Sequence, residues 1–204
     1  MIVIIDYGAG NLRSVLNALV RLGYQAKIAS TASELASAQA VILPGVGAAA
    51  DSMGNLERLG LVTPIRHFIA EGRPFLGVCV GLQLLFTGTE EGGWHQCLDI
   101  IPGVVRRLPT GLKIPHMGWN QLEQRISHPI FSGIPDEADF YFTHSFYAEP
   151  EDKSVVAGTT SYGLPMCSII IKDSLIATQF HPEKSGEYGL RMYANFLKTA
   201  LGVR

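Results

Sequence analysis

The chain has few cysteines, and none of them are paired in a motif. Its 204 residues include three cysteines, at positions 79, 97 and 167, and no CxxC pair occurs. A disulfide framework or a zinc knuckle needs paired or clustered cysteines, so the sequence argues against both and favours the reducing cytosol. Each cysteine therefore needs its own explanation.

Long hydrophobic runs and concentrated charge are also missing. No segment approaches the roughly 18 apolar residues of a membrane span. The N-terminal run IVII is too short for a signal peptide and lacks a basic lead-in. The formal net charge is −2, so neither a nucleic acid nor a membrane surface is expected as a partner. With 47% hydrophobic and 17% charged residues, the composition predicts one compact cytoplasmic domain over residues 1–204.

The order of apolar and helical segments predicts the fold class. The first half alternates short apolar runs with segments of helical periodicity. Apolar strands that alternate with helices are typical of a parallel sheet covered on both faces. From about residue 103 the expected strands are joined by short turns, which favours antiparallel pairing, and the chain closes with an amphipathic helix. The sequence thus predicts a three-layer α/β/α fold with a mixed, mostly parallel sheet. The expected strands are 2–6, 25–29, 40–44, 74–78, 103–108, 138–147, 154–160, 165–172 and 174–180, and the expected helices are 11–23, 63–72, 81–86 and 186–201.

Cys79 stands between two glycines, in the run GVCVG, where an expected strand becomes a helix. This pattern mirrors the nucleophile elbow GxSxG, a strained turn that presents a nucleophile. Glycines at the flanks avoid clashes with neighbouring elements, and a helix N-terminus favours the thiolate. A free cysteine is more often a small buried hydrophobe, so the motif alone leaves both interpretations open.

His181 and Glu183 follow the last expected strand in the run HPE. A cysteine that attacks an amide needs a base, and a carboxylate can orient that base. In an extended chain, side chains two residues apart point to the same side, so Glu183 is expected to reach His181. The alternative is an ordinary turn at a strand end. Both motifs fall at carboxyl ends of strands, where open parallel sheets place their sites.

A second glycine-rich segment, LPGVGAAADSM at residues 43–53, follows another expected strand. It is predicted to be a loop with main-chain donors for a tetrahedral oxyanion. The alternative is a phosphate-binding turn, but the lysine and the GK[ST] pattern of a P-loop are missing.

Taken together, GxCxGxQ and the later HPE resemble the class I, triad-type glutamine amidotransferases. These enzymes hydrolyse glutamine to glutamate and pass the ammonia to a synthase partner. The resemblance implies a flavodoxin-like domain, a triad of Cys79, His181 and Glu183, a thioester intermediate, L-glutamine as substrate, and no cofactor or metal. It also implies oxyanion and substrate contacts from a further set of residues: Gly45, Val46, Val80, Gln83, Thr143, His144 and Ser145.

Three more stretches resemble the branch of this family that serves histidine biosynthesis. They are DYGAGNLRSV at 6–15, PHMGWNQL at 115–122, and QFHPEKS around the HPE run. This resemblance implies a heterodimer with a (β/α)8 cyclase subunit and an ammonia path between the two. The 115–122 segment is expected to be an interface loop, although Met117 and Trp119 could equally plug a local core. The expected partner contacts are Asn11, Pro115, His116, Met117, Gly118, Trp119, Asn120 and Lys184.

Three alternatives remain open from the sequence. One is a glutaminase that serves aminobenzoate or pyridoxal phosphate synthesis. Another is a cysteine-elbow protein related to peptidases or chaperones, and the third is a non-catalytic interaction module. An intact triad argues against the last.

Overall fold

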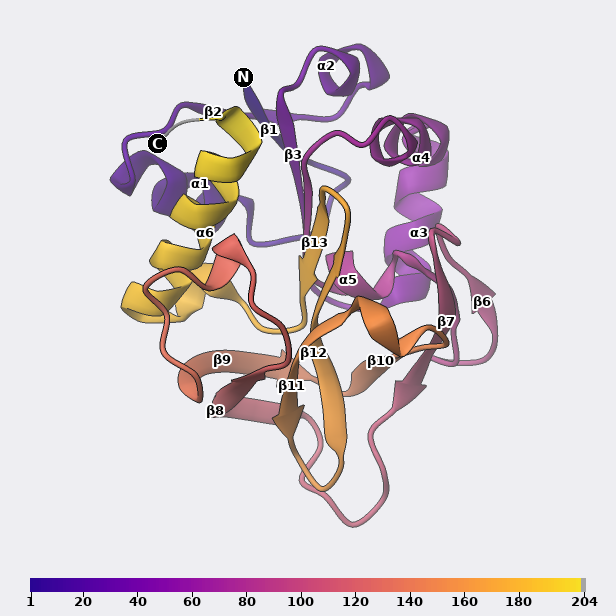
Figure 1. Ribbon diagram of the computed structural model, residues 1–204. Helices are drawn as coiled ribbons and strands as arrows, with labels where there is room; N and C mark the ends of the chain where they lie inside the picture. The colour runs from indigo at the N-terminus through magenta and orange to yellow at the C-terminus, as the bar shows by residue number, and fades with distance from the viewer. Residues whose placement is uncertain (203–204) are drawn as a thin grey trace.

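The computed structural model describes residues 1–202 (Figure 1). The last two residues of the predicted domain, 203 and 204, lie outside the described residues. Within the described chain, no helix is both long and apolar enough to cross a membrane.

Five parallel strands form the middle layer, in the order β2-β1-β3-β4-β13. All residues of β1, β3, β4 and β13 are buried. This burial explains their continuous apolar sequences, because helices cover both faces of a parallel sheet and leave no polar face. The strands are β1 (Ile2–Ile5), β2 (Ala26–Ala29), β3 (Ala40–Gly45), β4 (Phe75–Cys79) and β13 (Leu175–Thr178).

Helices on both sides of this sheet form the outer layers. Figure 1 shows α1 (Leu12–Arg21) and α6 (Gly186–Leu201) on one side, and α3 (Ala49–Arg58) and α4 (Val62–Ala70) on the other. Two shorter helices, α2 (Ala32–Ala36) and α5 (Val80–Gln83), follow β2 and β4. The predicted three-layer α/β/α fold with a mixed sheet is therefore confirmed.

The second half of the chain extends the sheet with antiparallel strands. Beyond β13 the order continues β12-β10-β7-β5-β6, while β11 also pairs with β8, and β8 with β9. The pairing is antiparallel as predicted, except that β5 and β7 are parallel. The bounds are β5 (Phe86–Thr89), β6 (His95–Gln96), β7 (Ile101–Arg107), β8 (His116–Gln124), β9 (Ala138–His144), β10 (Phe146–Pro150), β11 (Val156–Ser161) and β12 (Pro165–Lys172), with 3-10 turns η1 (Pro129–Phe131), η2 (Lys153–Val155) and η3 (Pro182–Lys184).

Two expected segments near the cysteine differ from the prediction. The helix expected over 81–86 ends at Gln83, and β5 begins at Phe86. The apolar run that follows Gln83 is fully buried, and it enters the sheet beside β7 instead of continuing the helix. The loop expected over 43–53 is shorter, because α3 already begins at Ala49.

Two further corrections concern the second half. The expected interface loop at 115–122 is mostly strand β8, which pairs with β9 from His116 to Leu122. The single strand expected over 138–147 is broken at Ser145 into β9 and β10. The two pieces pair with different neighbours, β9 with β8 and β10 with β7 and β12. This divergence explains the break.

Candidate active site

Cys79 ends β4 in a conformation that few residues other than glycine adopt. Its φ is 55° and its ψ is −108°, a strain of about 1–3 kcal/mol for such a residue. Two glycines let the turn pack tightly. A Cβ on Gly81 would lie 1.9 Å from the Leu43 carbonyl oxygen, and one on Gly77 would lie 2.7 Å from the Gly81 carbonyl oxygen. The chain thus makes the sharp strand-to-helix turn that GVCVG predicts.

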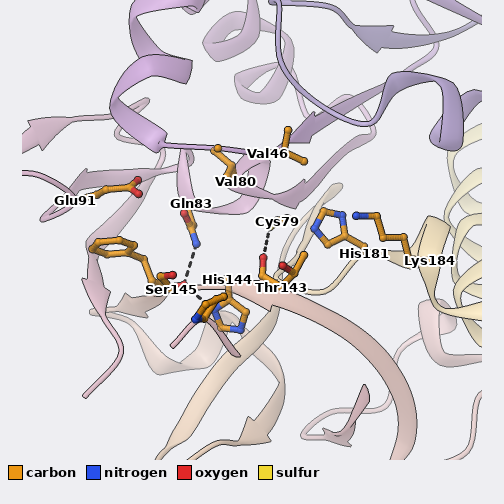
Figure 2. A pocket seen from close by; sticks show the side chains of 13 residues that line it. Val46, Cys79, Val80, Gln83, Glu91, Thr143, His144, Ser145, His181 and Lys184 are labelled. Carbon is orange, nitrogen blue, oxygen red and sulfur yellow. Dashed lines mark hydrogen bonds between the residues drawn. The ribbon is translucent and has the colours of Figure 1, made fainter. Parts of the chain in front are cut away.

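The Cys79 side chain lines a pocket of about 390 Å³ between the two halves of the chain (Figure 2). The residue is only 3% exposed, so its sulfur is almost fully buried at the pocket wall. The Sγ lies 3.9 Å from the Thr143 carbonyl oxygen, to which the thiol donates, and 3.7 Å from Nε2 of Gln179, which donates to it. The expected helix dipole is small here, because α5 has only four residues.

His181 and Glu183 form a buried pair beside this sulfur. Nδ1 of His181 lies 2.8 Å from Oε1 of Glu183, and the two side chains are 2% and 1% exposed. The chain between them is a 3-10 turn, η3, rather than the extended segment that the sequence suggested. The turn still brings the carboxylate to the ring. The other oxygen, Oε2, accepts a hydrogen bond of 3.3 Å from the Tyr193 hydroxyl on α6.

The free nitrogen of this imidazole is the chemically decisive atom. Among the described residues, Nε2 of His181 has no hydrogen-bond partner, although it is buried. Burial lowers the pKa of His181, but the neighbouring Cys79 sulfur and the Glu183 carboxylate raise it by more, to about 9. An imidazole held at Nδ1 and open at Nε2 can accept a proton from a neighbouring thiol.

Two glutamine side chains connect α5 to the opposite wall of the pocket. Nε2 of Gln83 donates to the Phe146 carbonyl oxygen at 3.0 Å and to Oε1 of Gln179 at 3.1 Å. The predicted substrate contact Gln83 lines the pocket, as do Thr143, His144 and Ser145 at the break between β9 and β10. These predicted residues therefore line the same pocket as the sulfur, and Gln83 also has a structural role.

The loop that follows β3 forms another wall. Gly45 is the register partner of Cys79 across β3 and β4, and a Cβ there would lie 2.6 Å from Cβ of Val80. Val46 and Val80 both line the pocket. The predicted oxyanion segment therefore lies directly beside the cysteine.

A family model for "Glutamine amidotransferase class-I" matches residues 3–200 of this chain. The chain belongs to the class I glutamine amidotransferase family. The protein "Imidazole glycerol phosphate synthase subunit HisH" of Dehalococcoides mccartyi strain CBDB1 is 57% identical over 99% of this chain and 98% of its own length. The protein of the same name from Chloroflexus aurantiacus is 51% identical over 100% of this chain and 98% of its own length. The predicted resemblance to the histidine-biosynthesis branch is thereby confirmed.

Solved structures of more distant proteins have the same fold. A protein described as a glutamine amidotransferase aligns with a TM-score of 0.76 at 22% identity, over 97% of this chain and 98% of its own. PurLQS from Thermotoga maritima aligns with a TM-score of 0.78 at 17% identity, over 97% of both chains.

The predicted partner contacts of this amidotransferase fall into two groups. Met117 and Trp119 on β8 are 62% and 57% exposed, so the core-plug interpretation is wrong. His116 is only 4% exposed and cannot present its ring to a partner, which corrects its assignment to the interface. The others are at least partly accessible, and Pro115 and Lys184 also line the pocket: Asn11, Pro115, Gly118, Asn120 and Lys184.

Sequence reasoning missed three residues at this site of the amidotransferase. Glu91 lines the pocket, and its Oε2 accepts a hydrogen bond of 2.8 Å from the Ala49 main-chain N–H at the start of α3. In Figure 2, Glu91 and Lys184 lie at opposite ends of the pocket. The other two are Gln179 and Phe146. Gln179 directly precedes the FHPE run, but no local pattern distinguishes Glu91 from the other acidic residues of a turn.

Proposed function

We propose that this chain is the glutaminase of an imidazole glycerol phosphate synthase, which hydrolyses glutamine through Cys79, His181 and Glu183. The ammonia passes to a (β/α)8 cyclase subunit that makes imidazole glycerol phosphate and AICAR, a step of histidine biosynthesis. One observation carries the proposal: beside a strained cysteine, a buried histidine is held at Nδ1 by a carboxylate and is unpartnered at Nε2.

The first half-reaction uses the thiol and the imidazole. The Cys79 proton passes to Nε2 of His181, and Sγ attacks the carboxamide carbon of glutamine, so that a C–S bond forms and the carbonyl electrons move to oxygen. When the oxyanion collapses, the C–N bond breaks and Nε2 returns its proton to the nitrogen, which leaves as ammonia. The glutamyl group remains on the sulfur as a thioester.

Water completes the reaction. It loses a proton to Nε2 and attacks the thioester carbon, after which the C–S bond breaks and the sulfur regains the proton. Glu183 keeps the ring in the tautomer that leaves Nε2 open, and it stabilises the imidazolium in both halves. The Cys79 sulfur and the Glu183 carboxylate raise the pKa of His181 to about 9, which supports this role, because it reflects their stabilisation of the imidazolium that the proton transfer creates.

The oxyanion needs donors on the far side of the carbonyl. The main-chain N–H of Val80, directly after the nucleophile, and that of Val46 in the adjacent loop are proposed for this role. The glutamine substrate is a zwitterion at its other end. Glu91 lies at the end of the pocket away from Lys184 (Figure 2), and its carboxylate is proposed to bind the α-ammonium group. Main chain at Thr143, His144 and Ser145 is proposed to hold the remainder of the amino-acid group.

The loop from Pro44 to Gly47 is proposed as a gate. The Tyr7 hydroxyl donates to the Pro44 carbonyl at 3.0 Å, and burial raises the pKa of Tyr7 to about 12, so it remains a donor. Glu91 fixes the other end at Ala49. Between these anchors, Gly47 has a φ of 85°. The peptide units between the anchors can turn over and offer either an N–H or a carbonyl to the oxyanion.

The partner surface is proposed on β8. Met117 and Trp119 are two residues apart on a strand and so share one face, and both are exposed. Methionine and tryptophan are enriched at protein interfaces. Because the same strand starts beside Pro115, at the pocket, a partner docked there would lie near the point of ammonia release. Asn11 and Lys184 are proposed to extend this contact.

Active-site labelling tests the proposal. A glutamine analogue with an electrophilic group should modify Cys79, and peptide mapping should locate the adduct there. Cys97 and Cys167 are internal controls, because burial raises the pKa of both thiols to about 12. Cys79→Ala should abolish glutamine-dependent turnover of the complex with the cyclase subunit but leave its ammonia-dependent turnover intact. Labelling at Cys97 or Cys167, or full glutamine turnover by Cys79→Ala, would contradict the proposal.

A further inference from the structure

The side chains of two buried histidines at the pocket have no role in the proposed chemistry. His116 on β8 and His144 at the end of β9 are 4% and 6% exposed. Nδ1 of His116 lies 3.0 Å from Nε2 of His144. The His116 ring is stacked between Phe142 and Tyr162, with centroid distances of 4.9 and 3.9 Å. Two imidazoles are seldom buried together unless their hydrogen bonds match, because each nitrogen must then find a partner of the right kind.

The Asn120 amide sets the direction of hydrogen bonding on one side. Its Oδ1 accepts from the Gln121 main-chain N–H at 2.9 Å, and its Nδ2 donates to the Ser161 carbonyl at 3.0 Å. These two bonds orient the amide, so the atom that lies 3.2 Å from Nε2 of His116 is Nδ2. An amide nitrogen only donates. Nε2 of His116 must therefore carry a lone pair, and the ring's hydrogen is on Nδ1.

The hydrogen bonds of His144 also place the hydrogen of the shared bond on Nδ1 of His116. Nδ1 of His144 lies 2.8 Å from the Phe146 carbonyl oxygen, which only accepts. This nitrogen carries a hydrogen, and Nε2 of His144 accepts the hydrogen on Nδ1 of His116. Every polar atom is matched when both rings are neutral Nδ1–H tautomers. Burial lowers the pKa of His116 to about 4. The pKa of His144 is lowered to about 3, chiefly by burial and in smaller part by the neighbouring His116 and His181.

This chain of bonds ends at a substrate-facing segment. The Phe146 carbonyl accepts from His144 and also from Nε2 of Gln83 at 3.0 Å. Gln83 in turn contacts Gln179, whose Nε2 donates to the Cys79 sulfur. The break in the strand at 143–146 is therefore held between the cysteine turn on one side and the histidine pair on the other.

We propose that His116 and His144 are positioning residues that, as a neutral pair, hold the main chain of residues 143–146 in place to bind the amino-acid end of the substrate. This rests on the proposed glutaminase function. His144 acts through its Nδ1–H on the Phe146 carbonyl, and His116 acts by fixing the tautomer of His144. β8 also presents Met117 and Trp119 on its exposed face, so the pair lies between that face and the pocket.

The ring tautomers can be measured without any activity. Two-bond ¹⁵N–¹H correlation spectra of the lone chain, at pH about 7 and about 5.5, assign protonation at each histidine nitrogen. Both His116 and His144 should be protonated at Nδ1 only, at both pH values, with assignments taken from His116→Gln and His144→Asn. A doubly protonated ring or an Nε2–H tautomer at either position, at pH about 7, would overturn the proposal. This measurement stands even if the wild-type complex proves not to be a glutaminase.

Variants of His144 separate positioning from mere filling of space. His144→Phe keeps bulk but removes the donor, so KM for glutamine should rise about five- to twentyfold, with kcat changed by less than about threefold. In His144→Asn an amide N–H can take the place of Nδ1–H, and KM should stay within about threefold of wild type. Alkylation of Cys79 by iodoacetamide, which needs no substrate site, should proceed at the wild-type rate in both.

Two outcomes contradict the proposal. One is a wild-type KM in His144→Phe, and the other is an equal rise in KM in both variants. If circular dichroism shows that His144→Phe does not fold, the tautomer measurement on the wild-type chain tests the proposal instead. Asn17→Asp, on the exposed side of α1, is the control for Asn120→Asp, which places an acceptor opposite Nε2 of His116. Only Asn120→Asp should protonate that nitrogen, and an unchanged His116 spectrum would overturn the assigned bond direction.

Discussion

Replacement of Glu183 by glutamine isolates the contribution of the carboxylate charge. Glutamine has the same shape, so its Oε1 can still accept from Nδ1 of His181, and its Nε2 can donate to the Tyr193 hydroxyl where Oε2 now accepts. The tautomer of the ring is then kept and only the charge is lost. A buried hydrogen bond to a charged group contributes about 1.5–3 kcal/mol. At 1.36 kcal/mol for each pKa unit, the pKa of His181 should fall from about 9 by about one to two units.

The same free energy appears in the rate. In the proposed mechanism Glu183 stabilises the imidazolium during attack by the sulfur, so kcat/KM should fall by about ten- to a hundredfold in Glu183→Gln. Steady-state glutaminase assays of the complex with the cyclase subunit measure this loss, and NMR titration measures the pKa. Glu187→Gln is the matched control, because its carboxylate is 81% exposed on α6, and its kcat/KM should equal that of wild type. A loss as large as that of His181→Ala would refute the reasoning, as would no loss at all.

The sign of the accompanying stability change follows from the raised pKa. Protonated His181 stabilises the folded state fully below its unfolded pKa, near 6.5, and this contribution is lost as pH rises through about 9. Urea unfolding of the lone chain should show that the free energy of unfolding declines as the pH rises from about 6.5 to about 9. This decline should be smaller in Glu183→Gln than in wild type. Equal declines in the two proteins would mean that Glu183 does not raise the pKa.

Three further predictions concern other parts of the fold. Because His116 and His144 have lowered pKa values, their contribution to stability should be lost as pH falls below about 6.5, by up to about 1.4 kcal/mol per pH unit for each ring. The urea midpoint of His144→Asn should therefore fall less steeply with decreasing pH than that of wild type. Gly81→Ala places a methyl group 1.9 Å from the Leu43 carbonyl oxygen. It should unfold the chain or lower its melting temperature by several degrees, since repacking of main chain costs more than about 1–3 kcal/mol. A melting temperature equal to that of wild type would contradict the close packing. The lone chain should be a poor glutaminase whose turnover rises at least about a hundredfold with the cyclase subunit and its ligand, and full activity of the lone chain would rule out the gate but not the triad.

The placement of Cys79 and His181 at one site was predictable from the sequence for a physical reason. A strained turn between a buried strand and a helix excludes side chains at its flanks, so the glycines around Cys79 are visible in the sequence. The position of His181 at the end of an apolar strand is equally local. Because carboxyl ends of parallel strands meet at one edge of a sheet, two local patterns were enough to predict that these residues lie together. The structure corrects the path to Glu183, which is a 3-10 turn, and the length of the helix after Cys79, which ends at Gln83.

What the sequence did not indicate depends on contacts between distant segments. The run 138–147 is apolar enough for one strand, and its break at Ser145 arises only because β9 and β10 pair with different neighbours. The segment 115–122 contains proline and glycine, as loops do, yet most of it becomes a strand because β9 offers it a partner.

The sequence by itself determined the layered fold and the placement of the cysteine, histidine and glutamate at one site, because apolar periodicity and turn glycines act over a few residues. Only the tertiary structure decided that Glu91 faces the pocket and that His116 is buried against His144. Those placements result from the pairing of strands and the packing of walls contributed by both halves of the chain. Hydrogen bonds between residues far apart in the sequence follow no fixed residue spacing, so no local sequence pattern predicts them.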